Sequence, residues 1–161
     1  MLVADLMTRN AASVRVDRTL AHAAHLMWDI DCGALPVIDG DNGKIIGMLT
    51  DRDICMASWS RGAAPDAIGV ADAMSQHVVH CLERDSVDRA KSLMQSNQIR
   101  RLPVVDGAGR LVGILSLADI ARAENNAQSR KLVPSLTGDG LAATLAGICR
   151  SPISRREVSA S

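Results

Sequence analysis

The chain has 161 residues, 47% of them hydrophobic, and its 18 Lys and Arg residues balance 18 Asp and Glu residues. This length and apolar content suffice for one compact domain or for two small domains that share a core. The neutral charge balance and the absence of Phe and Tyr leave no sign of the basic surface or aromatic platforms on which nucleic-acid binders depend.

The first predicted helix covers residues 20–30 and begins after Thr19, whose hydroxyl is a typical N-cap. Its apolar residues recur at the spacing of one helical face: Leu20, Ala23, Ala24 and Met27. Two β-rich runs follow over residues 35–39 and 44–49. The segment between them, Gly40–Gly43, contains Gly and Asn, which are typical of a tight turn.

Several blocks of sequence occur twice in one register. Leu35–Gly40 (LPVIDG) returns as Leu102–Gly107 (LPVVDG), a shift from position 35 to position 102, or 67 residues. The same shift relates Val3–Asp5 to Val70–Asp72, and Leu26–Met27 to Leu93–Met94. Gly47–Ile54 aligns with Gly113–Ile120 at a shift of 66, so the first turn holds one extra residue. The chain is therefore an internal repeat.

The second copy repeats the predicted elements of the first. Ser86 caps a helix whose apolar face contains Val87, Ala90 and Met94, and Gly107–Gly109 forms the turn between two strands. Helices over residues 51–59 and 117–124 begin directly after Thr50 and Ser116. Each copy thus reads β-α-β-β-α, which predicts a mixed α/β (α+β) fold.

The repeat predicts the following division of the chain: a first unit over 1–60, a linker over 61–68, a second unit over 69–124, and a C-terminal tail over 125–161. The linker is rich in small residues and contains Gly and Pro. Because a unit of about 55 residues buries only a modest fraction of its surface, we expect the two units to pack together.

The tail begins with polar residues and then carries Leu141, Leu145 and Ile148 at i, i+4, i+7 spacing. This pattern predicts a short amphipathic helix. Such a helix either packs on its own module or frays, or it docks a partner or a second subunit. The final segment, Ser151–Ser161, is expected to be disordered.

A hydroxyl and a carboxylate lie three residues apart at the start of each copy's last helix: Thr50 with Asp53, and Ser116 with Asp119. A carboxylate can accept both hydrogen bonds of a ribose diol, and a hydroxyl beside helix N–H groups can help to hold a phosphate. The alternative interpretation is structural, because the same spacing forms a capping box. The residues alone leave both interpretations open.

The tandem β-α-β-β-α units, the Leu-Pro-Val-x-Asp blocks and the Gly-x-x-Thr/Ser-x-x-Asp ends resemble the CBS-domain (cystathionine β-synthase type) family over residues 1–124. The resemblance implies a pseudo-twofold pair of units with two clefts between them. It also implies adenosine ligands, such as AMP, ADP, ATP, S-adenosylmethionine or NAD, and association into a homodimer.

The resemblance also implies which residues line each cleft. The first cleft would contain Arg100, Arg101, Pro103, Ser116 and Asp119, completed by Thr8 and Ala12 from the opposite copy. The second would contain Pro36, Thr50 and Asp53, completed by Ser75 and Val79. The family places an arginine three residues before the proline, where this chain has Arg100 in one copy and Gly33 in the other. We therefore expect the first cleft to bind a phosphate, and the second to bind weakly, to take a neutral adenosine group or to stay empty.

Other interpretations of several of these residues are structural. Ala12 and Val79 would fill the core, and Arg100 and Arg101 would be solvated surface charges. His22 and His25, and likewise His77 and His80, have a spacing that can ligate a metal, but no further ligand is placed by the sequence, so we predict no metal site. No catalytic motif with a nucleophile and its base is present, so we predict no enzymatic activity.

The four cysteines form no Cys-x-x-Cys pair, and no run of about 20 apolar residues could cross a membrane. We therefore expect a cytoplasmic protein with reduced thiols that contacts no membrane. The sequence as a whole favours a regulatory module that senses an adenosine nucleotide, such as AMP, ADP, ATP or NAD, and signals to a regulated protein that the sequence does not identify. The alternative is a structural homodimerisation or interaction module with vestigial clefts.

Overall fold

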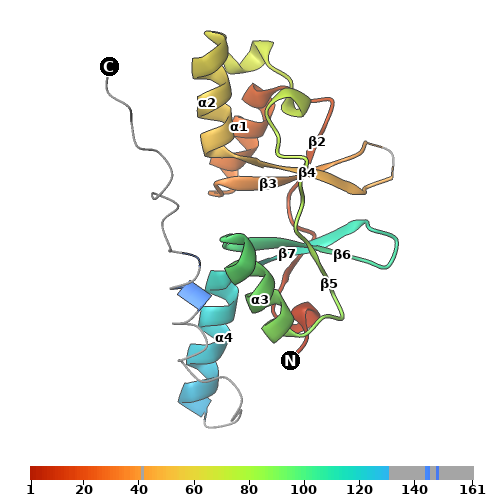
Figure 1. Cartoon of the computed structure of the whole chain (residues 1–161), viewed down its shortest axis with the longest axis vertical. Helices are drawn as coiled ribbons and strands as arrows, with labels where there is room; N and C mark the ends of the chain where they lie inside the picture. Colours follow the sequence, from red (N-terminus) through yellow and green to blue (C-terminus); the bar gives the residue numbers. More distant parts are fainter. Residues whose placement is uncertain (41, 131–143, 146–147, 149–161) are drawn as a thin grey trace. The chain divides into compact units, whose positions relative to one another are not determined.

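A computed structural model describes residues 1–40, 42–130, 144, 145 and 148 (Figure 1). The helices are α1 (Leu20–Asp29), α2 (Asp51–Arg61), α3 (Val87–Asn97) and α4 (Leu117–Arg130). The strands are β1 (Thr8–Arg9), β2 (Val14–Arg15), β3 (Ala34–Ile38), β4 (Ile45–Thr50), β5 (Cys81–Leu82), β6 (Arg101–Val105) and β7 (Leu111–Ser116). The predicted mixed α/β fold is confirmed.

The strands form two sheets, one with the order β2-β3-β4 and one with the order β1-β7-β6-β5. β2 runs parallel to β3, and β5 runs parallel to β6, whereas β4 is antiparallel to β3, and β1 to β7. The start of the first copy is thus divided. Its β1 joins the sheet built by the second copy, and its β2 stays with the first.

The chain forms two compact units that do not follow the order of the repeat. The α1–α2 unit consists of Thr8–Glu83 and Pro103–Ile114. The α3–α4 unit consists of Met1–Met7, Arg84–Leu102 and the described residues from Leu115 onward. The segment boundaries expected from the sequence stay a prediction.

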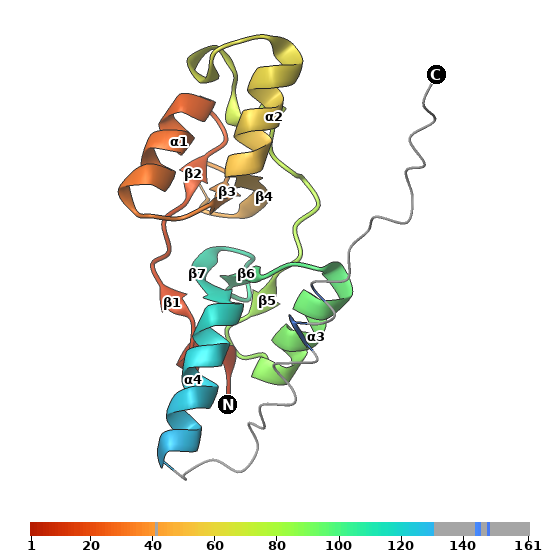
Figure 2. The same cartoon turned by 90° about the vertical axis from the view of Figure 1, so that its left-hand side faces the viewer.

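The α1–α2 unit has one apolar core beneath its two helices, which lie beside each other in both views (Figure 1, Figure 2). Its buried members are Val14, Leu20, Ala23, Met27, Leu35, Val37, Leu49, Ile54, Ile68 and Val70. The α1 face expected from the sequence is therefore the face that packs inward. Thr19 caps α1 as predicted, because its hydroxyl accepts a hydrogen bond from the N–H of His22 at 3.3 Å.

The α3–α4 unit buries an ion pair among apolar residues. Lys91 Nζ on α3 lies 2.7 Å from Glu124 Oε1 on α4, and the two residues are only 9% and 3% exposed. The second oxygen, Oε2, is buried and has no hydrogen-bond partner among the described residues. The sequence analysis did not anticipate this pair, because the two residues lie 33 positions apart. Ser86 caps α3 as predicted, accepting from the N–H of Arg89 at 3.2 Å.

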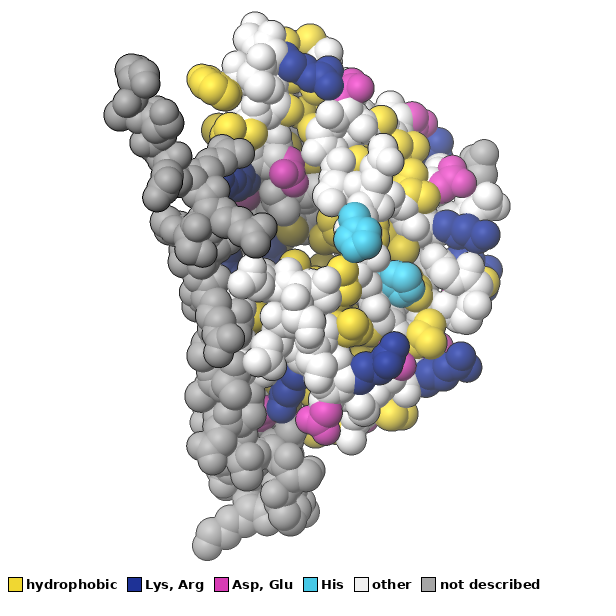
Figure 3. Space-filling model, in the orientation of Figure 1, with side chains coloured by type: hydrophobic (Ala, Val, Ile, Leu, Met, Phe, Trp, Pro, Cys, Tyr) yellow, Lys and Arg dark blue, Asp and Glu magenta, His cyan; other side chains and the backbone are white. Residues whose placement is uncertain are grey.

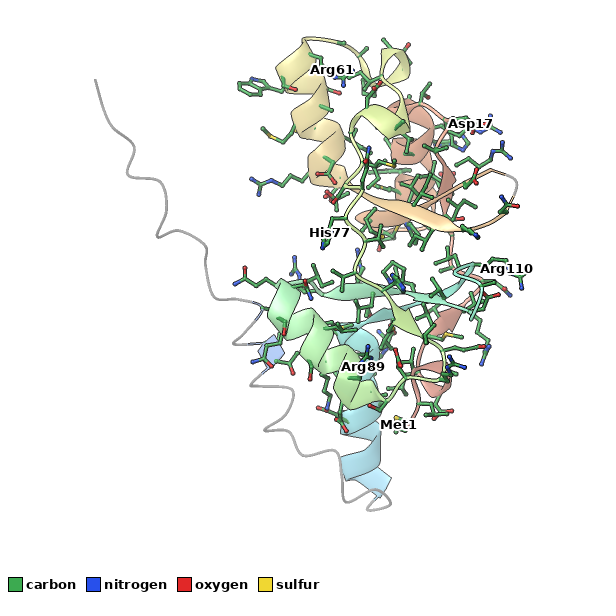
Figure 4. All side chains as sticks on the ribbon, turned by 45° about the vertical axis from the view of Figure 1, so that its right-hand side comes forward. Met1, Asp17, Arg61, His77, Arg89 and Arg110 are labelled. Carbon is green, nitrogen blue, oxygen red and sulfur yellow. The ribbon has the colours of Figure 1, made fainter. Side chains whose placement is uncertain are left out.

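The two strand-connecting turns use glycines with positive φ, Gly43 at 63° and Gly109 at 79°. In the second turn, the carboxylate of Asp106 accepts hydrogen bonds from the N–H groups of Ala108 and Arg110 and from the Arg110 side chain. These bonds, first the one from the Arg110 N–H and then the one from its side chain, hold the pKa of Asp106 below the ordinary aspartate value. Figure 4 labels Arg110.

The helix ends differ somewhat from those expected. α2 extends to Arg61, where Gly62 ends it in the left-handed conformation, and Pro65–Ala67 forms a short 3₁₀ turn in the expected linker. α4 continues to Arg130, beyond the predicted end at 124. In the tail, Leu145 and Ile148 have helical backbone, whereas Leu141 and Ser151–Ser161 lie outside the described residues, so the amphipathic helix stays a prediction. Within the part of the chain that is described, no helix is both long and apolar enough to cross a membrane.

Candidate functional site

Thr50 and Asp53 form a capping box at the start of α2. The carboxylate Oδ2 of Asp53 accepts from the Thr50 N–H at 2.8 Å and from the Thr50 hydroxyl at 2.7 Å. The Asp53 N–H in turn donates to the Thr50 hydroxyl oxygen at 3.2 Å. The structural role considered for this pair is therefore real. It occupies only one carboxylate oxygen, and Oδ1 receives no hydrogen bond from the described residues.

Ser116 and Asp119 repeat this geometry at the start of α4. Asp119 Oδ2 accepts from the Ser116 N–H at 2.8 Å and from the Ser116 hydroxyl at 2.6 Å. The difference from the first copy lies at the other oxygen, because Oδ1 of Asp119 is paired with the guanidinium of Arg122. Both oxygens of this carboxylate are thus already engaged.

The α1–α2 unit brings three of the predicted residues to one face of its sheet. Pro36 on β3 lies opposite Met48 on β4, and Met48 pairs on its other side with Ser75. Met48 and Ser75 exchange backbone hydrogen bonds of 2.9 and 2.8 Å. Because residues two apart on a strand share a face, Thr50 lies on the same face as Met48. Pro36, Thr50 and Ser75 are therefore grouped on this face, and their role in an adenosine-binding cleft stays a prediction.

This close approach depends on Gly47. A Cβ at Gly47 would lie 2.6 Å from the Met74 sulfur and 3.1 Å from the Ser75 carbonyl oxygen. A larger residue at this position would displace the Met74 side chain and shift the Ser75 carbonyl by a few tenths of an ångström. Val79 is half-buried and follows in a segment without regular structure.

The backbone of Arg100 is hydrogen-bonded to the first residue of α4. Its carbonyl oxygen accepts a hydrogen bond from the N–H of Leu117, the residue after Ser116, at 2.9 Å. Arg100 and its neighbour Arg101 are both exposed, so their guanidinium groups are available to an anion. The α3–α4 unit thus groups Arg100, Ser116 and Asp119.

The equivalent position in the other copy cannot hold an arginine without rearrangement. Gly33 accepts a hydrogen bond from the N–H of Asp51 at 3.2 Å, and a Cβ on Gly33 would lie 2.9 Å from the Asp51 carboxylate. Asp51 therefore occupies the space that a side chain at position 33 would need. It also adds a second negative charge beside Asp53.

The remaining residues predicted for the first cleft lie in the α1–α2 unit. Thr8 is exposed and pairs with Ile114 on β7, and Pro103 is buried on β6. Ala12 packs against the apolar core, which agrees with the structural interpretation of this residue. The expected approach of Thr8 and Ala12 to Asp119 stays a prediction.

Comparison with known proteins identifies the family of this chain. The family model described as "CBS domain" matches residues 3–60 and again residues 70–126. The chain belongs to the CBS-domain family. Among its relatives is the CBS domain-containing protein YhcV of Bacillus subtilis, which is 40% identical over 74% of this chain and 82% of that protein.

Solved CBS structures show adenosine ligands in similar proteins. CBSX2 in complex with AMP is 28% identical, with a TM-score of 0.68 over 79% of this CBS chain and 98% of that chain. The CBS domain pair of MJ0100, in complex with 5′-methylthioadenosine and S-adenosyl-L-methionine, is 26% identical, with a TM-score of 0.67 over 76% and 98% of the two chains. A similar CBS fold therefore holds both a phosphorylated and an unphosphorylated adenosine ligand.

Another similar structure contains metal. Hypoxic Response Protein I, solved with two coordinated zinc ions, is 34% identical, with a TM-score of 0.68 over 76% of this CBS chain and 98% of that chain. In the present chain, the described residues contain no group of three or more His, Cys, Asp or Glu side chains that could hold a metal ion. His77 and His80 are both exposed, and Figure 4 shows where His77 lies.

The structure adds two site residues that the sequence analysis missed, Asp51 and Arg122. Both follow from the repeat, because the shift of 66 residues aligns Asp51 with Leu117 and Met56 with Arg122. A residue-by-residue comparison of the two helix starts would have revealed them. In this CBS pair, Asp51 adds a negative charge near Asp53, and Arg122 adds a positive charge beside Asp119.

Proposed function

We propose that this CBS pair is a regulatory module that binds adenosine ligands and has no catalytic activity of its own. The observation that carries the proposal is the pair of hydroxyl and carboxylate groups at the start of α4, beside the exposed side chains of Arg100 and Arg101. This set combines an acceptor for a ribose diol with donors for a phosphate. The AMP complex of CBSX2 supports this ligand class.

The two sites are proposed to prefer ligands of different charge. The Asp119 site has Arg100, Arg101 and Arg122 close by in sequence or in space, which favours AMP, ADP, ATP or NAD. The Asp53 site has Asp51 and no arginine at Gly33, which disfavours a phosphate and favours a neutral or cationic adenosine ligand. The 5′-methylthioadenosine and S-adenosyl-L-methionine complex of MJ0100 supports this second preference.

Regulation follows if the ligand binds two conformations of the module with unequal affinity, because only that difference shifts their populations. The shifted population would then change the contact with a regulated protein in the cytoplasm. Charged side chains of both signs are interspersed on the face drawn in Figure 3, which suits a protein partner better than a polyanion.

The test is isothermal titration of the purified protein with AMP, ADP, ATP, NAD, S-adenosylmethionine and adenosine, accompanied by thermal unfolding. We expect saturable binding of at least one phosphorylated ligand and a rise in unfolding temperature, because a ligand that binds only the folded state stabilises it. If no ligand produces heat or raises the unfolding temperature, the proposed sensor function is wrong and the structural alternative is favoured.

The alternative, a structural homodimerisation module, is favoured by one feature of the α1–α2 unit. Both tryptophans are exposed, Trp28 on α1 by 85% and Trp59 on α2 by 76%. Ile30 and Met56, each within three residues of a tryptophan in the sequence, are also exposed. A hollow of about 390 Å³ that reaches Trp28 is lined by residues of both helices. Exposed aromatic side chains around a hollow are typical of protein interfaces.

A second copy of this chain is the partner that suits the α1–α2 face best. The two helices carry Asp29 and Asp51 as well as Arg52 and Arg61. An isologous interface places the same surface on both sides, so a surface with both signs of charge complements itself. We propose that the homodimer forms here, whether or not the adenosine sites are occupied.

Sedimentation velocity tests the dimer. We expect the wild type to sediment as a dimer at micromolar concentration, and Trp28→Glu with Trp59→Glu to sediment as a monomer, because the two charges would lose their hydration in the interface. Leu2→Glu, an equally simple change at a residue that is 47% exposed in the α3–α4 unit, is the matched control and should remain dimeric. A tryptophan variant that is as dimeric as the wild type would contradict this interface.

A further inference from the structure

The feature that separates the two sites most sharply is Arg122. Its guanidinium pairs with Oδ1 of Asp119, while Asp119 Oδ2 is held by Ser116. The arginine side chain is 71% exposed, whereas the aspartate side chain beneath it is only 11% exposed. Arg122 thus covers the one carboxylate oxygen that the capping box leaves over.

The other copy has no such cover. Met56 is the residue that corresponds to Arg122, three positions after Asp53, and it is 47% exposed. A methionine cannot donate a hydrogen bond, so Oδ1 of Asp53 stays open. The same capping box therefore presents an open carboxylate oxygen in one copy and a covered one in the other.

Asp119 Oδ2 already accepts two hydrogen bonds, so a ribose diol must place both of its hydroxyl groups on Oδ1, and the second of them replaces Arg122 there. The displaced guanidinium then lacks its anion. A phosphate on the same ligand supplies a new one, and Arg is well suited to take it with two parallel charge-assisted bonds. A ligand without a phosphate leaves the arginine uncompensated and gains less from binding.

We propose that Arg122 is a specificity-determining residue, which makes the Asp119 site select phosphorylated adenosine ligands and reject unphosphorylated ones. The inference rests on the proposed function, because it assumes that ribose binds at Asp119. It goes further because it assigns the choice between phosphorylated and unphosphorylated ligands to Arg122, a residue that competes with the ribose for Asp119. This effect adds to any attraction between the ligand phosphate and Arg100 or Arg101.

The expected effect is moderate, because an ion pair whose arginine is this exposed is weak and easily broken. In Arg122→Met, adenosine affinity should rise about three- to tenfold, since the competitor is gone. AMP affinity should fall about three- to tenfold, since a phosphate contact is lost. The ratio of AMP to adenosine affinity should therefore fall by about tenfold or more.

The experiment is isothermal titration with AMP and adenosine in an Asp53→Ala background, so that only the Asp119 site contributes. Arg89→Met in the same background is the matched control, because it removes one positive charge from α3, where the Arg89 guanidinium lies 3.4 Å from the carboxylate of Asp85 (Figure 4). The control should leave the ratio unchanged. Circular dichroism and thermal unfolding establish that each variant is folded.

The reciprocal variant places the arginine in the other copy. Met56→Arg in an Asp119→Ala background recreates the i, i+3 spacing of Asp119 and Arg122 on α2. We expect the affinity for adenosine at the Asp53 site to fall about three- to tenfold. The affinity for AMP should fall by a smaller factor or rise. Because Met56 is exposed, this substitution disturbs no core packing.

The outcomes separate the two hypotheses. AMP binding that persists with an unchanged ratio in Arg122→Met overturns the role of Arg122 and leaves the proposed function intact. A fall in the affinity for both ligands by the same factor also overturns it, because that result describes a general binding contact. If the Asp53→Ala protein binds neither ligand, the proposed function of the Asp119 site fails, and the inference fails with it.

Discussion

Replacing Asp119 with alanine is expected to weaken AMP binding by about 10- to 100-fold, because a carboxylate that accepts ribose hydroxyl groups contributes charge-assisted hydrogen bonds of about 1.5–3 kcal/mol. Replacing Asp53 should leave AMP affinity within about threefold of the wild type. The difference arises because Asp119 has the exposed arginines near it, whereas Asp53 has Asp51. Isothermal titration of AMP into the two variants measures it.

The Asp119→Ala and Asp53→Ala variants are matched controls for effects on folding stability. Both aspartates complete a capping box at the start of a helix, so both substitutions should destabilise the protein by about 1 kcal/mol. Urea unfolding checks this equivalence. If Asp119→Ala loses stability but binds AMP as tightly as the wild type, the carboxylate is a cap alone and the proposed site is wrong.

Replacing Lys91 with methionine is expected to destabilise the protein by about 3–5 kcal/mol, because Glu124 would remain buried with its charge unpaired. The double variant Lys91→Met with Glu124→Leu should recover most of this loss. Removing both charges also removes the unsatisfied Glu124 Oε2, and apolar side chains of similar volume fill the same space. Urea unfolding of the two single variants and the double variant gives the coupling energy.

The surface ion pair of Arg89 and Asp85 is the control for this double-mutant cycle of Lys91 and Glu124. Its arginine side chain is 65% exposed, so Arg89→Ala should cost less than about 1 kcal/mol. Two results would contradict the prediction for the buried pair. One is a Lys91→Met protein as stable as the wild type, and the other is a double variant that is less stable than either single variant.

Much of this CBS pair could be predicted from local patterns. The helices begin where Thr19, Thr50 and Ser86 predict, because an N-cap hydroxyl and the N–H three residues later belong to the same turn. The Asp119 and Arg122 contact is also local, at i and i+3, and the sequence analysis passed over it although its spacing was visible. Comparing the two copies position by position would have found it.

Contacts between segments that are distant in the sequence could not be predicted in the same way. The pairing of Met48 with Ser75, and of Thr8 with Ile114, depends on how strands from the two copies are arranged within the sheets. The family resemblance suggested that the copies exchange their first strands. No rule of spacing within either copy could have predicted which residues meet.

By itself, the sequence determined the repeat, because matching blocks can be read directly from it. It also determined the elements within each copy and the two hydroxyl and carboxylate pairs, because each of these is set by residues within one or two turns of one another. Only the tertiary structure decided that Asp51 fills the space at Gly33 and that Lys91 meets Glu124 in a buried site. The physical reason is that burial and charge pairing depend on which elements pack together.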